Sequence, residues 1–271
     1  MISMRRQFIA LAMALGAAIL PLRGIGETPP STIGIVIMHG KSGSPSKHMG
    51  SLERSLEGKG YLVANLEMPW SGRRQYDVDV GAGEREVESA LDALRSKGAR
   101  KLFVAGHSQG GVFALYFGSK HALDGVIAIA PGGDVGSTVF RRELGESVEL
   151  ARKMISEGKG SETARFFDTE GSKGTFPVVC AASAYLSWFD PEGAMAMKTS
   201  VRNMRPQTPV LFISPKDDYP GLLKFRKPTF DTLPPHPLNE FVELNSNHMG
   251  APSLSGEVIA RWISEVDSRA K

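Results

Sequence analysis

The chain has 271 residues, of which 41% are hydrophobic and 23% are charged, and it contains one cysteine, Cys180. This composition excludes a disordered, collagen-like or multi-span membrane protein, and a single cysteine excludes an intramolecular disulfide and a cysteine-rich metal site. Cys180 lies in an apolar run, so we expect it to be a buried, unreactive thiol.

Residues 1–26 are predicted to form an export signal. Arg5 and Arg6 supply positive charge, and the apolar stretch 8–20 has 13 residues, fewer than the roughly 18 of a membrane-spanning helix. The arginine pair also resembles a twin-arginine signal loosely. Cleavage after Gly26 would give a periplasmic or secreted protein, and an uncleaved N-terminal anchor is the alternative.

The charge balance argues against a nucleic-acid partner. The chain has 32 basic and 29 acidic residues, and the signal holds three of the arginines and no acidic residue. The mature protein is therefore expected to be near neutral. Membrane association is expected only through the export signal.

Beyond a short linker at 27–30, apolar runs alternate with amphipathic helices. The predicted strands are 33–38, 61–66, 101–106, 125–130, 209–214 and 240–244. The predicted helices between and after them are 46–59, 83–97, 109–120 and 253–266. Strands that are apolar on both faces and alternate with helices predict an α/β fold, with a mostly parallel sheet of about six strands covered by helices on both faces.

The segment 134–205 interrupts this alternation. It is predicted to contain helices at 144–155, 162–167 and 194–204, which would form a small helical cap inserted into one domain spanning 27–271. The alternative is a long crossover carrying surface helices. Because ligands of such sheets bind at the carboxyl ends of the strands, reactive residues are expected there.

The pattern Gly-x-Ser-x-Gly at 106–110 follows a predicted strand and opens a predicted helix, which is the setting of a nucleophile elbow. A sharp turn would expose the Ser108 hydroxyl, and glycines at both ends of the pattern avoid a steric collision. The helix N-terminus favours developing negative charge. Ser108 is therefore the candidate nucleophile; a glycine-rich turn without chemistry is the alternative.

The turn His39-Gly40-Lys41-Ser42-Gly43 follows the first predicted strand and can aim backbone amides at the same place. With the amide of Gln109, that of Lys41 is predicted to form an oxyanion hole, Ser42 being the alternative. His39 is expected to brace this loop.

Two further strand ends supply an acid and a base. Asp217 and Asp218 follow the strand 209–214, and Asp218 is the preferred partner for a histidine. His248 follows the strand 240–244 and precedes the last helix. The chain order Ser, Asp, His indicates a triad in which His248 is the general base and Asp218 orients it.

With these four features the chain resembles the α/β-hydrolase superfamily over about residues 31–268. The resemblance implies a covalent acyl-enzyme on Ser108 and no metal or organic cofactor. The chain departs from many members in two respects: their first antiparallel strands are absent, and Pro215 stands where they have glycine before the acid.

The substrate is less defined by the sequence. Trp70 follows the second strand and Trp188 lies in the predicted cap, so both are candidates for substrate contact. For Trp188, packing in the core of the cap is the alternative. A small to medium carboxylic ester is the expected substrate, with amide, thioester and lactone as alternatives. Two other functions stay open: an acyltransferase or peptidase with the same triad, and a non-catalytic binding protein of the same fold.

Overall fold

The structure is a computed structural model that describes residues 29–170 and 174–269; the predicted signal lies outside the described residues. Six parallel strands form the central sheet in the order β2-β1-β3-β4-β7-β8. They are β1 (Ile33–Met38), β2 (Leu62–Leu66), β3 (Lys101–His107), β4 (Gly125–Ile129), β7 (Val210–Asp217) and β8 (Glu240–Asn247). The predicted α/β class and all six strands are confirmed.

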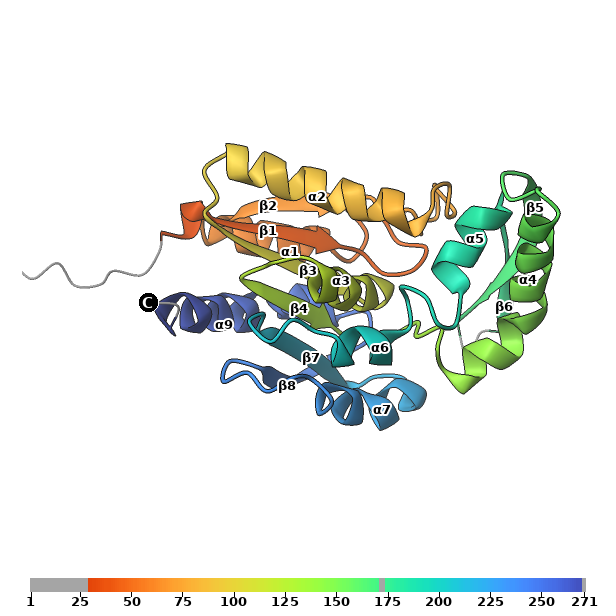
Figure 1. Ribbon diagram of the computed structural model, residues 1–271. Helices are drawn as coiled ribbons and strands as arrows, with labels where there is room; N and C mark the ends of the chain where they lie inside the picture. Colours follow the sequence, from red (N-terminus) through yellow and green to blue (C-terminus); the bar gives the residue numbers. More distant parts are fainter. Residues whose placement is uncertain (1–28, 171–173, 270–271) are drawn as a thin grey trace, which may run out of the picture.

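The helices cover both faces of this sheet (Figure 1). They are α1 (Gly50–Gly58), α2 (Val80–Ser96), α3 (Gln109–Lys120), α4 (Thr138–Ser156), α5 (Ala182–Phe189), α6 (Met197–Arg202), α7 (Pro220–Phe230), α8 (Ala251–Leu254) and α9 (Gly256–Arg269), preceded by a short 3-10 turn at Pro30–Thr32. Within the described residues, no helix is long and apolar enough to cross a bilayer.

Alternation along the strands divides the core into two layers. In β3, Leu102 and Val104 join the core that holds the buried residues of α2 and α3. Phe103 and Ala105 point the other way, into the core of α1 and α9. Because successive side chains of a strand point to opposite faces, this sheet is buried on both sides, which explains its continuous apolar sequence.

A cap, which we define as residues 134–196, lies across the carboxyl edge of the sheet (Figure 1). It contains α4, α5 and an antiparallel hairpin of β5 (Thr163–Thr169) and β6 (Thr175–Ala181). Helix α6 packs against α3 and α7 in the main body instead. The cap therefore ends before the predicted limit at residue 205.

Several local predictions differ from the structure, and helices α5 and α7 and strand β6 were not predicted. The predicted helix at 162–167 is strand β5, where Phe166 and Asp168 are buried and Arg165 and Phe167 exposed, the two-residue period of a strand. The helix predicted at 194–204 is limited to α6, and that at 253–266 is divided into α8 and α9. Helix α7 was not predicted, since Pro228 lies inside it and proline disfavours helix interiors.

Candidate active site

Ser108 lies in a strained turn between β3 and α3, with φ of 54° and ψ of −116°. The glycines of the motif allow this turn. A Cβ on Gly106 would lie 2.0 Å from the carbonyl oxygen of Gly110, and a Cβ on Gly110 would lie 2.6 Å from the carbonyl oxygen of His39. Only glycine permits backbones this close, so the motif residues have the spacing that the turn requires.

The structure brings Ser108, His248 and Asp218 together from three strand ends. His248 Nε2 is 3.0 Å from Ser108 Oγ, and His248 Nδ1 is 3.0 Å and 3.1 Å from the two oxygens of Asp218. Asp218 is 7% exposed, whereas Asp217 is exposed to solvent. Of the two adjacent aspartates, the structure places Asp218 against the histidine.

Arg226 of α7 holds the other side of Asp218, a contact that sequence reasoning missed. Its Nη1 lies 2.5 Å from Asp218 Oδ2, and its Nε donates to the carbonyl of Pro131 at 3.3 Å. Burial alone would raise the pKa of Asp218, but the hydrogen bond to His248 and the Arg226 charge outweigh it and lower the pKa. The carboxylate therefore stays ionised while it is buried.

His107, within the motif, braces the loop of His248. Its Nε2 donates to the carbonyl oxygen of His248 at 2.9 Å, and the side chain is 2% exposed. Burial, with a smaller contribution from the neighbouring His248, lowers the pKa of His107 to about 3. A neutral imidazole thus connects the turn of Ser108 to the loop that carries His248.

The loop 39–43 packs directly on the turn of Ser108. A Cβ on Gly40 would lie 3.1 Å from Ser108 Cβ. His39, 0% exposed, accepts from the Met68 amide at 3.0 Å and donates to the Gly40 carbonyl at 2.7 Å. The amide of Ser42 donates to the Trp70 carbonyl at 3.0 Å, so it is already engaged.

The structure does not place Trp70 or Trp188 at an open pocket, although both were predicted to contact substrate. Each is 1% exposed, and their rings pack edge to face with centroids 5.5 Å apart. Trp70 Nε1 donates to the His39 carbonyl and Trp188 Nε1 to that of Val78. The rings of both indoles are buried against other side chains, and both N–H groups donate to backbone carbonyls. Trp70 and Trp188 are therefore core residues that connect α5 with the main body.

The open side of Ser108 is bordered by the start of α7. A Cβ on Gly132 would lie 3.1 Å from Leu222 Cδ1 and 3.8 Å from Ser108 Oγ, so both side chains flank Gly132. The ring of Tyr219, which is 43% exposed, lies 5.1 Å from that of His248. Met249 is also exposed. Leu222 therefore lies beside the segment that flanks Ser108, and Tyr219 lies beside His248.

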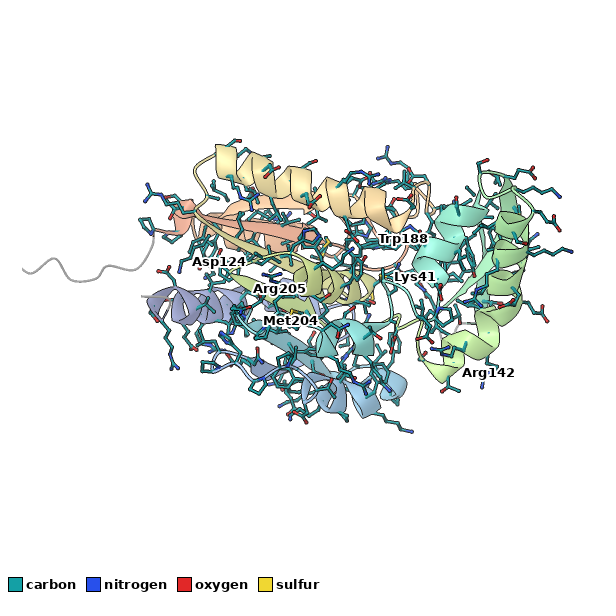
Figure 2. All side chains as sticks on the ribbon, in the orientation of Figure 1. Lys41, Asp124, Arg142, Trp188, Met204 and Arg205 are labelled. Carbon is teal, nitrogen blue, oxygen red and sulfur yellow. The ribbon has the colours of Figure 1, made fainter. Side chains whose placement is uncertain are left out.

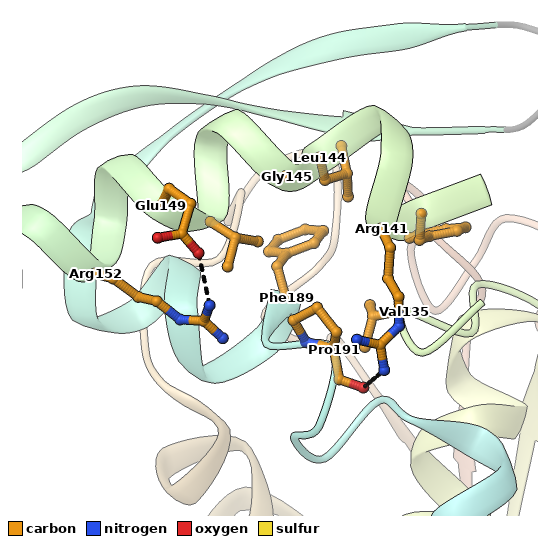
Figure 3. Close-up of a pocket in the computed structure, with 10 residues that line it drawn as sticks. Val135, Arg141, Leu144, Gly145, Glu149, Arg152, Phe189 and Pro191 are labelled. Atoms are coloured by element: carbon orange, nitrogen blue, oxygen red, sulfur yellow. Dashed lines mark hydrogen bonds and ion pairs between the residues drawn. The ribbon is translucent and has the colours of Figure 1, made fainter. Parts of the chain in front are cut away.

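A separate cavity of about 240 Å³ lies within the cap (Figure 3). Its floor is apolar, with Val135, Leu144 and Phe189, and its rim carries Arg141 and Arg152. Both arginines are already engaged, Arg141 with the carbonyl of Pro191 and Arg152 with Glu149. The cavity is lined by cap residues alone, so it is distinct from the surface around Ser108.

Comparisons with known proteins agree with this architecture. A model of the alpha/beta hydrolase family matches residues 35–262. The structure resembles that of a metagenome-derived lipolytic enzyme from a study of LipS and LipT (18% identity, 89% of this chain and 96% of that chain, TM-score 0.59). It also resembles Est1E from Butyrivibrio proteoclasticus with ferulic acid bound (14%, 89% and 92%, 0.60) and the monoacylglycerol lipase of Paleococcus ferrophilus (18%, 87% and 94%, 0.57). A search of curated protein sequences gives no match.

The family match covers most of the chain and includes every strand of the central sheet except the first two residues of β1. The chain therefore belongs to the alpha/beta hydrolase family. The resemblance inferred from residues 39–40, 106–110, 218 and 248 is confirmed at the level of family and fold.

The burial of His107 predicts how stability depends on pH. The folded state keeps this histidine neutral down to pH about 3, whereas the unfolded chain binds a proton below its ordinary pKa of 6.5. The free energy of unfolding should therefore fall as the pH drops from 6.5, by up to about 1.4 kcal/mol per pH unit from this group. His107→Gln, which retains a donor for the His248 carbonyl, should reduce that slope in urea unfolding measured from pH 7 to pH 4. Parallel curves for the two proteins would contradict this assignment.

Proposed function

We propose that this protein is a serine hydrolase that cleaves carboxylic esters, with Ser108 as nucleophile, His248 as general base and Asp218 as the residue that orients the base. The observation that carries the proposal is the continuous chain of contacts from Ser108 Oγ through both ring nitrogens of His248 to Asp218. A carboxylate can only accept, so Asp218 selects the tautomer with hydrogen on Nδ1 and leaves Nε2 free to accept from Ser108.

The reaction follows from this tautomer. Ser108 Oγ attacks the ester carbonyl as His248 Nε2 takes the hydroxyl proton, and the imidazolium is stabilised by Asp218. The imidazolium then protonates the leaving alcohol, which gives an acyl-enzyme on Ser108. A water molecule, deprotonated by His248, attacks this ester and releases the carboxylic acid and the free serine.

The negative oxygen of each tetrahedral intermediate is proposed to bind the backbone amides of Lys41 and Gln109. Gln109 is the first residue of α3, where amides lack partners within the helix. Lys41 follows Gly40, which packs on Ser108, and the engagement of the Ser42 amide favours Lys41 over Ser42. In other enzymes such donors contribute about 3–4 kcal/mol each to the transition state.

An ester is the proposed substrate because of the surroundings of Ser108 and the family. Leu222 lies beside Gly132, which is next to Ser108, and the exposed Tyr219 ring lies beside His248; apolar and aromatic side chains at these places suit a small to medium acyl or alkyl group. The compared structures include a lipolytic enzyme and a monoacylglycerol lipase, which supports ester chemistry by analogy of fold.

Hydrolysis of p-nitrophenyl butyrate tests the proposal. We expect Ser108→Ala and His248→Ala to lower kcat by at least about 10⁴-fold, and Asp218→Asn by about 10³- to 10⁴-fold, because the tautomer and the imidazolium lose their support. Asp217→Asn is the matched control on the exposed neighbour and should retain wild-type kcat. Equal losses in the two asparagine variants, or an active Ser108→Ala variant, would refute the assignment.

We also propose that the protein is exported, with a periplasmic or secreted destination. Supporting this are the two arginines at positions 5 and 6 and the apolar stretch 8–20. N-terminal sequencing of protein from the periplasmic or extracellular fraction should begin at Glu27. Full-length protein found only in the cytoplasm would contradict export.

A further inference from the structure

Lys41 and Gln109 are the residues whose amides are proposed to form the oxyanion hole. Their side chains are both connected by hydrogen bonds to the carboxylate of Asp168 in the cap, Lys41 directly and Gln109 through Tyr76. Lys41 Nζ lies 2.5 Å from Asp168 Oδ1. Tyr76 OH lies 3.0 Å from Asp168 Oδ2 and 3.1 Å from Gln109 Nε2. We call these four residues (Lys41, Tyr76, Gln109 and Asp168) the Asp168 network. Lys41 lies where the main body meets the cap (Figure 2), so the network crosses that junction.

The direction of each hydrogen bond in the network is defined. Asp168 can only accept, so the Tyr76 hydroxyl donates to it and accepts from the Gln109 amide. Burial and the charge of Asp168 raise the pKa of Tyr76 well above its ordinary value, so the phenol keeps this proton. The Gln109 side chain is therefore held through Tyr76, and the Lys41 side chain is held directly.

Burial makes the network rigid. Asp168 is 0% exposed and Tyr76 3%, and the Lys41 side chain is 10% exposed. A charge pair in such surroundings is weakly screened by water, and separating it would leave a buried charge unpaired. Moving Lys41 away from Asp168 is therefore unfavourable. The ion pair thus fixes the distance between loop 39–43 and strand β5.

The cap holds Asp168 from its own side. The Tyr185 hydroxyl of α5 donates to the Phe167 carbonyl at 2.5 Å, and the Thr169 hydroxyl donates to Glu143 of α4. The Lys41 ammonium also donates to the Thr169 carbonyl at 2.9 Å. The end of β5 is thus anchored to two cap helices and to the main body at successive residues.

The backbone at Tyr76 is strained, which supports a functional role for the hydrogen bond between Tyr76 and Asp168. Tyr76 has φ of 61° and the preceding Gln75 has φ of 48°, the left-handed region that side chains other than glycine rarely adopt. The Tyr76 amide donates to the Pro69 carbonyl at 2.6 Å, which holds the strained turn. Strain of this kind persists where surrounding structure imposes it and often accompanies functional sites.

We propose that Asp168 is a positioning residue for the oxyanion hole. Through Lys41 it fixes one backbone amide, and through Tyr76 and Gln109 it fixes the other, so a residue of the cap sets the distance between the two donors. Asp168 acts through these residues and takes no part in proton transfer. This inference rests on the proposed hydrolase function and adds the cap to the parts of the protein that stabilise the transition state.

The variant that tests the proposal is Asp168→Asn. Asparagine keeps the shape of the side chain, but its NH₂ group donates and cannot accept the hydrogen bond of Lys41 Nζ or Tyr76 OH. The backbone amides of Lys41 and Gln109 are still present in this variant. Loss of a whole oxyanion donor costs about 10²- to 10³-fold in kcat, so displacement of the donors should lower kcat by about 10- to 100-fold. The KM for p-nitrophenyl butyrate should change by less than about 3-fold, because the donors bind the transition state more than the substrate.

A pair of inhibitors separates positioning from general damage to the fold. An alkyl trifluoromethyl ketone forms a tetrahedral adduct with the serine and places an oxyanion in the hole, whereas the matching methyl ketone binds mainly without it. Asp168→Asn should weaken the first inhibitor by the factor lost in kcat/KM and leave the second within about 2-fold. A purely structural role would lower the unfolding temperature without changing the ratio of the two inhibition constants.

Two further variants complete the experiment. Glu192→Gln removes another acidic side chain of the cap, one that pairs with Arg141 at the surface, and should leave kcat and the inhibitor ratio unchanged. Tyr76→Phe removes only the hydroxyl and should lower kcat by about 3- to 10-fold with the same change in inhibitor ratio. This milder variant decides the question if Asp168→Asn does not fold.

The outcomes distinguish this inference from the proposed function. Wild-type ester hydrolysis with a reduced kcat and a shifted inhibitor ratio in Asp168→Asn or Tyr76→Phe supports the positioning role. Wild-type hydrolysis with unchanged kcat and ratio in folded variants overturns it and leaves the hydrolase assignment standing. Wild-type protein without Ser108-dependent hydrolysis overturns both.

Discussion

The arrangement of the site depends on the close contact between two backbones, the turn of Ser108 and the loop 39–43. A Cβ at Gly110 would lie 2.6 Å from the His39 carbonyl, and a Cβ at Gly40 would lie 3.1 Å from that of Ser108. Such an approach holds the Ser108 turn next to loop 39–43 before any substrate binds. The buried β1 and β3, which pair in parallel register, hold the two segments from below. Preorganisation of this kind is what electrostatic stabilisation of a transition state requires, because the donors need not rearrange during the reaction.

Each of the two buried carboxylates near this contact, Asp218 and Asp168, is held between two partners. Asp218 is flanked by His248 on one side and by Arg226 on the other, so its carboxylate stays ionised in a buried position. Asp168 is flanked in the same manner by Lys41 and Tyr76. Burying one member of such a pair alone would be costly, and each pair therefore fixes the distance between the elements that carry it. Through these pairs α7 positions Asp218, and the cap contacts the loop of the proposed oxyanion hole.

The parts that sequence reasoning predicted depend on local patterns. Apolar runs identified all six central strands, and the glycines around Ser108 identified the turn, because both signals lie within a few neighbouring residues. The structure also brings Ser108, Asp218 and His248 together, as their chain order and their places after predicted strands suggested; their catalytic roles stay a prediction. What was missed depends on contacts between distant residues. Asp168 lies 127 residues from Lys41 in the chain, and its strand was interpreted as a helix because a short apolar run fits both. Arg226 was missed because the prolines in α7 are not typical of a helix, so this helix was not predicted. Trp70 and Trp188 were predicted to contact substrate because the sequence does not show that their side chains are buried.

If Ser108 is an activated nucleophile, it should react covalently with a fluorophosphonate probe. The purified mature protein is treated with the probe and digested, and the adduct is located by mass spectrometry. We predict a single adduct on the peptide that contains Ser108, which is lost in Ser108→Ala and strongly slowed in His248→Ala. A correctly folded wild-type protein that gives no adduct, or one modified at another serine, would show that Ser108 is not the nucleophile.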